Sequence, residues 1–425
     1  MNYPAAHALP DGMAPHDGMN EHPPLVVFGA QRWNFDWQRT QQLLTRLAKR
    51  YRVLYVEEPR TTHQDPWLEV TQVAPGVEVL VAHTRCDAPG FHADQLPVTG
   101  RLLAGFLRER GIVEPLAWLD TPAALPLAEA LRPRALVYDC HEDVSATCDG
   151  EALREHEERL LRLADVVLAG GPSLYESLRR RHANVHCLAN AVDAAHFAPP
   201  STEGGISESI EAVSARAIHA AIPNPRLGFQ GVIDERLDLA LLARIADLRP
   251  DWQFLLAGPL RGVSPGALPQ RGNLRWLGPQ THAILPHLQA HWDVCLLPFE
   301  PAACARHATP IEALQYLAGQ KSVVATPVHD VAALHGKIVR IADGPEAFVE
   351  ACRAAMCERG PLRRQRRIDA MIAVHSASWD RAVERVHRLL VEFAHEPTDA
   401  AGVFAPALFA AASRPGAHRG ASCGA

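Results

Sequence analysis

Short apolar runs alternate with amphipathic stretches along most of this chain. The first run, residues 24–29, is followed by a loop, by a helical pattern with Leu43, Leu44 and Leu47 on one side, and by a second run at residues 52–57. Runs of this length suit buried strands, so the pattern predicts a strand, a helix and a parallel strand with a right-handed connection. The same interpretation predicts further strands at residues 77–81, 116–120, 135–140, 165–171, 225–231, 252–257, 273–277, 294–297 and 322–326.

One stretch carries the most local information. After the strand at residues 294–297, a loop ends at Thr309 and Pro310, and an apolar helical face follows until Gly319. Thr309 suits the N-cap, Pro310 suits the first helical position, and Thr309 and Glu312 have the spacing of a capping box. The free amides at such a helix start attract anions, which predicts a phosphate site. A βαβ unit without a ligand is the alternative.

Composition narrows the class of protein. A chain of 425 residues suits two domains, and its net charge of −6 gives no general reason to expect nucleic-acid binding. The nine cysteines include no Cys-x-x-Cys pair, which favours reduced thiols in a cytoplasmic protein. The N-terminus lacks the features of a signal peptide, and no apolar run approaches the length of a membrane span. His282, His287 and His291 lack the glutamate of a metalloprotease helix, so no metal site is predicted.

Four segments resemble one family of proteins. The loop after the first strand reads WNFDWQRTQQLL, a later strand and helix read ADVVLAGGPSLYESL, a third segment reads LANAVDAAHF, and the fourth is the stretch around Thr309. These segments resemble GT-B glycosyltransferases of the family-4-like kind, within a bacterial subgroup that has a Trp-rich first loop. The resemblance implies an α/β fold in which two Rossmann-like domains face each other across a cleft, with a C-terminal helix returning to the first domain.

Changes of composition and the resemblance together predict the domain boundaries. Residues 199–224 are rich in Ser, Glu, Ala and Pro, which is typical of a linker. The predicted division is a disordered segment at 1–23, an acceptor domain at 24–198, a linker at 199–224, a donor domain at 225–362, C-terminal helices crossing back at 363–395, and a disordered tail at 396–425.

The resemblance assigns the first domain to the acceptor. Gly29 would let a ligand approach the backbone, Trp33 would stack on a sugar ring, and Arg39 would bind a phosphate or carboxylate. Burial of Trp33 in the core and a surface ion pair of Arg39 are the alternatives. His141 follows the strand at residues 135–140, where α/β proteins line their ligand crevice, and the resemblance implies a catalytic place beside the donor sugar. Its alternative is a solvated or helix-capping cluster.

The resemblance assigns the second domain to a nucleotide-sugar donor, a co-substrate, and implies no cofactor. Gly231, Gly258 and Gly278 each follow a predicted strand, as expected where a nucleotide lies across the crevice; ordinary turns are the alternative. The implied donor site also contains Arg236, His307, Thr309, Pro310, Ile311 and Gln315, with Arg306 as a catalytic residue that neutralises the diphosphate.

Three positions depart from the family pattern. His307 and Gln315 stand where the family usually has glutamates, and Glu312 stands where the subgroup commonly has a lysine that meets the diphosphate. A carboxylate there would repel the diphosphate. Two hypotheses follow. One is a retaining, metal-independent glycosyltransferase that builds a bacterial surface polysaccharide or glycolipid, and the other is a GT-B-fold scaffold subunit of the same pathway without transfer chemistry. A nucleotide-sugar epimerase is a third alternative.

The expected partners are a nucleotide-diphosphate sugar and a glycan or lipid-linked acceptor, without nucleic acid. The run Arg363, Arg364, Arg366 and Arg367 is most simply a solvated helix face. Its alternative is a peripheral contact with the anionic inner face of the plasma membrane, as in GT-B proteins that act on lipid-linked acceptors.

Overall fold

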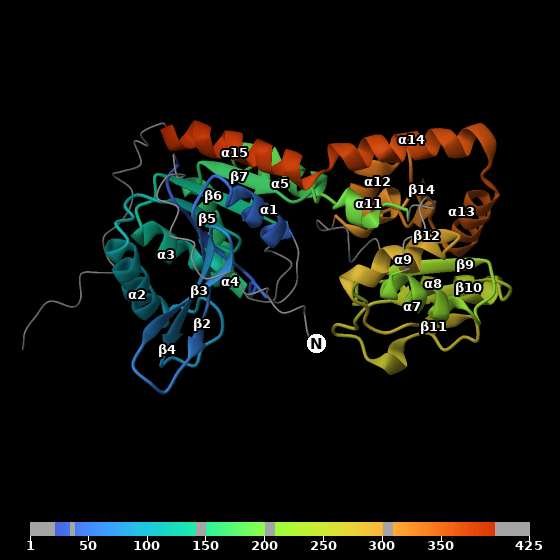
Figure 1. Cartoon of the computed structure of the whole chain (residues 1–425), viewed down its shortest axis with the longest axis horizontal. Coiled ribbons are helices and arrows are strands. Elements are labelled where there is room, and N and C mark those ends of the chain that lie inside the picture. The colour runs from blue at the N-terminus through green and yellow to red at the C-terminus, as the bar shows by residue number, and fades with distance from the viewer. Residues whose placement is uncertain (1–21, 35–38, 142–149, 200–208, 301–308, 396–425) are drawn as a thin grey trace, which may run out of the picture.

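The computed structural model describes residues 22–34, 39–141, 150–199, 209–300 and 309–395. Two sheets, each covered by helices, form two lobes that are joined at the top of the view in Figure 1. No helix of these residues is both long enough and apolar enough to cross a membrane.

Within the described residues, the first sheet has eight strands: β1 Leu25–Phe28, β2 Val53–Thr61, β3 Trp67–Ala74, β4 Val77–Thr84, β5 Leu116–Leu119, β6 Ala135–Cys140, β7 Val166–Ala169 and β8 Val185–Cys187. Their order is β3-β4-β2-β1-β5-β6-β7-β8, and all neighbours are parallel except β3 and β4. The carboxyl ends of the parallel strands therefore share one edge, as the predicted βαβ units require.

Successive residues of β1 face two different hydrophobic cores. Leu25 and Val27 belong to the core beneath α1 Arg39–Leu47 and α15 Trp379–His395, whereas Val26 and Phe28 belong to the core beneath α2 Leu96–Glu109, α3 Leu125–Ala130 and α4 Gly150–Leu163. All four side chains of β1 are fully buried. A parallel strand covered on both faces is expected to be continuously apolar, which explains why these runs read clearly in the sequence.

The second sheet has six strands in the described part of the chain: β9 Arg226–Gln230, β10 Gln253–Ala257, β11 Leu274–Trp276, β12 Val294–Leu297, β13 Val323–Ala325 and β14 Arg340–Ile341. Their order is β11-β10-β9-β12-β13-β14, and all neighbours are parallel. The remaining elements are α5 Pro172–Leu178, α6 Ala194–Phe197, α7 Ile210–His219, α8 Leu239–Leu248, α9 Leu285–Ala290, α11 Glu312–Ala318, α12 His329–His335, α13 Pro345–Cys357, α14 Gly360–Ser376, η1 Pro122–Ala124, η3 Pro265–Ala267 and η4 His282–Ile284.

The chain passes between the lobes at two adjacent places. Ala191 lies in the first-lobe core and Val192 in the second, so the first passage precedes the predicted domain end at residue 198. The second passage separates α14, which packs on α11, from α15, which packs on α1. The amide of Val192 donates to the carbonyl of Ala377 at 3.0 Å, and Val192 pairs with Ser378 as an isolated bridge. The predicted helical tail is therefore two helices, of which α15 returns to the first lobe (Figure 1).

The predicted elements are confirmed where they are buried and missed where they are exposed or short. The predicted strands at 135–140 and 294–297 are β6 and β12 to the residue. Strands β3, β8 and β14 were not predicted, because none of their residues is buried and their patterns lack a continuous apolar run. Helix α7 lies within the predicted linker and packs against α9, starting at Ser209, whose side chain accepts from the amide of Ala212.

Candidate functional site

Polar side chains meet where two neighbouring strands of the first sheet, β5 and β6, end. Asp120 follows β5, and Asp139 and His141 lie at the end of β6. The Nε2 atom of His141 lies 3.0 Å from Oδ2 of Asp139 and 3.8 Å from Oδ1 of Asp120. Both carboxylates are buried, whereas 30% of the His141 side chain is exposed. His141 is therefore the member of this group that can reach a ligand, at the edge where α/β proteins bind one.

Arg39 holds Asp139 in place. It donates to both oxygens of Asp139, at 2.8 and 3.3 Å, and to the carbonyl of Leu188 at 2.5 Å, and it is 6% exposed. The guanidinium of Arg39, which was predicted to bind the acceptor, is occupied by these bonds. The structure instead shows the alternative of an ion pair, though a buried one, and Arg39 serves His141 indirectly by orienting Asp139.

The charges of this group shift each other's pKa values. Burial alone lowers the pKa of His141, but Asp139 and Asp120 outweigh it and raise the pKa above its ordinary value. Burial raises the pKa of Asp139, but Arg39 and His141 overcome it and hold that pKa well below its ordinary range. Burial raises the pKa of Asp120 to about 6, with His141 opposing and Asp139 adding to the rise. The arrangement therefore favours a protonated His141 beside an ionised Asp139.

These three side chains are also the one group in the described residues whose ligand atoms, all within 4.8 Å of one another, could hold a metal ion. However, both oxygens of Asp139 accept from Arg39, and the oxygens of Asp120 accept from the Trp118 indole at 2.8 Å and the Thr40 hydroxyl at 3.2 Å. Because each carboxylate oxygen has a protein donor and Arg39 adds a positive charge, the group suits hydrogen bonding better than cation binding.

Two predicted acceptor residues are buried by packing. Trp33 is 3% exposed and packs edge-on against Tyr55, with ring centroids 5.2 Å apart. A Cβ atom on Gly29 would overlap the hydroxyl of Tyr55, which donates to the carbonyl of Gln31 at 2.7 Å. The core alternative is therefore correct for Trp33, and the position of Tyr55 accounts for Gly29 without a ligand. Neither residue presents a surface to an acceptor.

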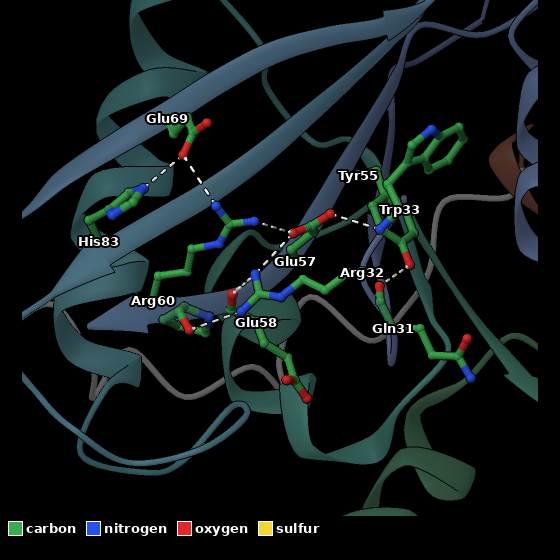
Figure 2. Close-up of polar contacts among 10 residues, drawn as sticks. Gln31, Arg32, Trp33, Tyr55, Glu57, Glu58, Arg60, Glu69 and His83 are labelled. Carbon is green, nitrogen blue, oxygen red and sulfur yellow. Dashed lines mark hydrogen bonds and ion pairs between the residues drawn. The ribbon is translucent and has the colours of Figure 1, made fainter. Parts of the chain in front are cut away.

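A cluster of charges fixes the first loop instead (Figure 2). Arg32 donates to Oε2 of Glu57 at 2.9 Å and to the carbonyl of Glu58 at 2.6 Å, and the amide of Trp33 donates to Oε1 of Glu57 at 2.8 Å. Arg60 lies 3.8 Å from Glu57 and extends the cluster toward β3 and β4. Arg32 of the loop and Arg60 of β2 have 34% and 50% of their side chains exposed, so they are the cations of this cluster that reach solvent.

The second sheet presents backbone at the corresponding edge. Gly231, Gly258 and Gly278 follow neighbouring strands, and the amide of Gly258 donates to the carbonyl of Gly278 at 2.9 Å. Their φ values are 144°, 152° and 77°, which favour glycine. A Cβ atom on Gly258 would overlap the carbonyl oxygen of Gly231, whereas one on Gly278 would meet nothing within 4 Å. The three predicted glycines are thus brought together as a bare edge, named here the glycine edge.

Helix α11 begins beside this edge with an acidic residue. Oε1 of Glu312 lies 2.6 Å from where a Cβ atom on Gly231 would stand. Burial raises the pKa of Glu312, and Arg236 opposes the rise. Arg236 is held by Asp234, to which its guanidinium donates at 2.7 to 3.0 Å. The predicted donor residue Arg236 is therefore already neutralised by a neighbour.

Gln315 lies one turn further along α11. Its side-chain oxygen accepts from Nε2 of Gln230 at 3.0 Å, and Gln230 is buried at the end of β9. This bond leaves the amide group of Gln315 as the part that can donate to a ligand hydroxyl. The Oε1 atom of Gln230 is buried and has no hydrogen-bond partner in the described residues.

Thr309 joins the two lobes. Its hydroxyl donates to Oδ2 of Asp330 at 2.5 Å, and Oδ1 of Asp330 accepts from the amide of Ser173 at 3.0 Å. The carbonyl of Thr309 accepts from Asn190 at 2.9 Å. A Cβ atom on Gly171 would overlap both the Thr309 hydroxyl and the Asp330 carboxylate. We call this set the Asp330 clasp, and it places the start of α11 against the Gly-rich turn after β7.

The predicted capping box at Thr309 is wrong. Helix α11 begins at Glu312, and its N-cap Ile311 makes no side-chain capping bond, because the Thr309 hydroxyl is engaged by Asp330. Pro310 precedes the helix, and Ile311 packs against the first-lobe core. Arg306 and His307 lie outside the described residues, so their contacts with the donor stay predictions.

Sequence reasoning missed four residues that shape the site. Asp120 and Asp139 stand at the ends of predicted strands, and polar residues there were a usable signal. Asn190 lies in the LANAVDAAHF segment, but nothing in that pattern indicates its bond to Thr309. Asp330 follows β13 on α12, where a first-turn acid looks like an ordinary helix start.

The comparisons with known proteins come from sequence and from structure. No protein-family model matches the chain. Among curated proteins, the putative teichuronic acid biosynthesis glycosyltransferase TuaH of Bacillus subtilis (strain 168) is 23% identical over 263 residues. That match covers 57% of this chain and 64% of the relative's length, which is less than two thirds of it.

Three solved structures illustrate the structural likeness. Sucrose-phosphate synthase from Thermosynechococcus elongatus aligns with a TM-score of 0.66 at 15% identity, over 87% of this chain and 99% of that one. Anabaena HepE in complex with UDP and glucose aligns at 0.64 and 14%, over 87% and 100%. The α,α-trehalose-phosphate synthase (UDP-forming) from Burkholderia vietnamiensis aligns at 0.63 and 14%, over 88% and 99%. The predicted GT-B fold and the predicted resemblance to GT-B glycosyltransferases are both confirmed.

Proposed function

We propose that this chain, a protein of the GT-B fold, is a glycosyltransferase that moves a sugar from a nucleotide-diphosphate sugar to a glycan or lipid-linked acceptor. The proposal includes a hexosyl group, retention of configuration, independence from metal ions, and a cytoplasmic role in making a bacterial surface polysaccharide. The name of the TuaH relative and the UDP in the HepE structure support the pathway and the donor class. The glycine edge carries the proposal, because it leaves backbone open at the place where such folds bind nucleotides.

The donor would lie along the glycine edge with its diphosphate near the start of α11. Gly278 has open space beside it, and Gln315 can donate a hydrogen bond to a ribose hydroxyl. Arg306 and His307 belong to this proposal from the sequence, with Arg306 as the cation that stabilises the leaving diphosphate. In the reaction, the bond from the anomeric carbon to the diphosphate oxygen breaks, and the acceptor oxygen bonds to that carbon on the same face. The acceptor proton passes to the released diphosphate.

His141 would act beside the transferred sugar. Its Nε2 atom is buried toward Asp139, so Nδ1 is the nitrogen left for a ligand. Because Asp139 and Asp120 favour the protonated ring, His141 can donate a hydrogen bond to a sugar hydroxyl or to developing negative charge. Arg39 then acts as a positioning residue through Asp139.

Two observations favour the alternative of a scaffold without transfer chemistry. Glu312 places a carboxylate beside Gly231, where a diphosphate would be repelled. Arg236, the first cation after the Gly231 turn, is neutralised by Asp234. Protonation of Glu312, which its burial favours, is what would reconcile this residue with an active enzyme.

The test is calorimetric titration of the purified chain with UDP, GDP, dTDP and their common sugar conjugates, followed by measurement of nucleotide release from any conjugate that binds. An enzyme is expected to bind one nucleotide in the micromolar range and to hydrolyse its conjugate slowly without an acceptor. Arg306→Ala should weaken binding, and His141→Ala should lower release at least tenfold with little change in binding. His92→Ala, an exposed histidine elsewhere, is the matched control.

Each outcome separates the hypotheses. If nucleotide-sugar conjugates bind but none of them releases its nucleotide, the scaffold hypothesis is supported. Failure of every nucleotide to bind a folded sample would overturn the proposal. Glu312→Lys should preserve or strengthen nucleotide binding in an enzyme, whereas a scaffold should be indifferent to it. Release that survives a chelator in excess would support independence from metal ions.

A further inference from the structure

A cavity lies at the opposite end of the second sheet from the glycine edge. Its volume is about 1180 Å³, and it is lined where β9, β12 and β13 begin, by Arg226, Asp293 and Ser322. Helix α14, along the top of the second lobe in Figure 1, and the turn after α11 complete its wall. The five residues of β9 separate it from Gly231 by roughly 16 Å, at about 3.3 Å per residue. This cavity is therefore distinct from the proposed donor site.

The lining of this cavity has an excess of positive charge. The acidic side chains in it are Asp293 and Glu358. The cationic side chains in it are Arg226, Lys321, Arg359, Arg363, Arg366 and Arg367.

The two acids are already engaged. Glu358 accepts from Arg366 at 2.7 Å and from Arg340 at 2.9 Å, and Asp293 accepts from the backbone amide of Arg226 at 2.8 Å. A single carboxylate thus serves two guanidinium groups. Little negative charge is left in the cavity for its other cations.

Several of the cations have only neutral partners or none. The guanidinium of Arg226 donates to the carbonyls of Ile222 and His219, and that of Arg359 to backbone carbonyls of its own turn. Among the described residues, Arg363 and Arg367 form no ion pair. The Nε atom of Arg367 is buried and has no hydrogen-bond partner there.

These cations also repel one another. Burial lowers the pKa of Lys321, and the nearby charges of Arg363 and Arg367 lower it further. Lys321 lies in the turn after α11. Its ammonium donates to the carbonyl of Ala290 at 3.2 Å, and its backbone carbonyl accepts from Arg366 at 2.8 Å. Apart from the ion pair of Arg366 with Glu358, the cluster is therefore held by hydrogen bonds to backbone carbonyls.

We infer that this cavity binds a phosphorylated ligand, with its phosphate between Arg363, Arg367 and Lys321. Guanidinium groups fit phosphate oxygens in two-pronged fashion, and an anion would replace the repulsion among these cations by attraction. The cavity is larger than a phosphate group needs, and Phe197 and Pro225 give its wall apolar area for an uncharged part of the ligand. The predicted solvated face of α14 is thus only partly correct, because this side of the arginine run faces a cavity.

The phosphate can belong to a soluble molecule or to a lipid headgroup, and the test separates the two. The full chain is titrated with sodium pyrophosphate by calorimetry, and it is sedimented with vesicles of phosphatidylglycerol or, as the neutral reference, phosphatidylcholine. The variants are Arg363→Ala/Arg367→Ala and, as the matched control, Arg364→Ala, which removes an exposed arginine of the same helix outside the cavity. Thermal unfolding confirms that each variant folds.

Loss of binding by at least tenfold in the double variant, with less than twofold change in Arg364→Ala, is the expected result. If it is seen with pyrophosphate, the ligand is soluble; if it is seen only with phosphatidylglycerol, the ligand is a headgroup. Arg363→Lys/Arg367→Lys should retain part of the binding, since the charge is kept. Binding of neither probe, or equal loss in the double variant and in Arg364→Ala, would overturn the inference.

The outcome does not depend on transfer activity. Pyrophosphate bound at the glycine edge would not respond to Arg363 and Arg367, so an unchanged signal in the double variant would assign it there and also count against the cavity. The double variant is further expected to unfold at the same or a higher temperature than the natural chain, because it relieves repulsion without removing an ion pair. A large drop would indicate a structural role and contradict the inference.

Discussion

The two edges that face each other across the lobes are built in opposite ways. The first-lobe edge is made of side chains, with Arg39, Asp139 and His141 in one connected group. The second-lobe edge is made of backbone, where Gly231 and Gly258 leave no room for a side chain to stand. Charged side chains therefore form the first-lobe edge, whereas open backbone forms the second-lobe edge.

The comparison shows that a motif residue can either support a site or contact the ligand. In the first lobe, Arg39 and Trp33 support the site from beneath, and His141 alone of its group reaches the edge. In the second lobe, the residues that would contact a ligand are the glycines of the glycine edge, which have no side chain. A residue type that could bind a sugar or a phosphate is thus weak support for a ligand contact until its burial is known.

The largest expected effect tests the first-lobe edge. Arg39→Met removes the guanidinium partner of the buried Asp139, which should lower the free energy of unfolding by about 3–5 kcal/mol. Arg39→Met/Asp139→Asn should recover much of that loss, because the carboxylate that lost its guanidinium partner is replaced by a neutral amide. Arg85→Met, which breaks the exposed pair with Asp65, is the control and should cost less than about 1 kcal/mol. Denaturant unfolding measures all three, and equal costs for Arg39→Met and Arg85→Met would contradict the structural role.

The next effect tests the glycine edge. Gly258→Ala places a methyl group on the carbonyl of Gly231 and strains a φ of 152°, so we expect about 2–4 kcal/mol of destabilisation and weaker nucleotide binding. Gly266→Ala is the matched control, because a Cβ atom there meets nothing within 4 Å. Thermal unfolding and nucleotide titration measure both. Tolerance of alanine at residue 258 would show that the edge is less constrained than its geometry indicates.

A smaller effect tests the contact between the lobes. Asp330→Ala removes the acceptor of the Thr309 hydroxyl and of the Ser173 amide, which should cost about 1.5–3 kcal/mol. Solution scattering should also show a wider particle, since the clasp joins the lobes. Asp343→Ala, an exposed acid in the same lobe, should change neither quantity. An unchanged scattering profile in Asp330→Ala would mean that the lobes are held elsewhere.

The smallest effect is a pH dependence at the start of α11. Burial raises the folded-state pKa of Glu312, so its contribution to stability is present below the unfolded-state pKa and is lost as pH rises through the folded-state value. Glu312→Gln should therefore gain stability and nucleotide affinity relative to the natural chain, and the gain should grow as pH rises from below the ordinary glutamate pKa to above the raised folded-state pKa. Thermal unfolding and titration across that range check it, with the exposed Glu346→Gln as control. A gain that does not depend on pH would refute the assignment.

The sequence predicted the buried framework well because burial on both faces of a parallel strand produces a continuous apolar run. That is the situation of β1, β6 and β12, whose residues are all buried. Strand β3, with Trp67 exposed and no buried residue, produces no such run, and it is held by pairing with β4 rather than by its own pattern. Edge strands that bury none of their residues, namely β3, β8 and β14, are therefore the ones that the apolar pattern does not predict.

The candidate site was predictable where its residues follow predicted strands, as the three glycines and His141 do. The three glycines were predicted because both the ends of the strands and the glycines themselves can be recognised in the sequence. By contrast, Thr309 and Asp330 are 21 residues apart and meet Ser173 from the other lobe, 157 residues from Asp330. The capping box failed for the same reason, because a partner from a distant segment took the Thr309 hydroxyl. Local pattern cannot predict such competition between hydrogen-bond acceptors.

The paired passages at Val192 and Ala377 have a consequence for how the lobes can move. Two covalent connections that were far apart would each restrain the lobes independently, but these two are bonded to each other by one hydrogen bond and one bridge. They therefore act as one pivot, about which the lobes could bend and twist. The glycine edge and His141 lie in different lobes, so their separation depends on the orientation of the lobes about that pivot, which the Asp330 clasp restrains.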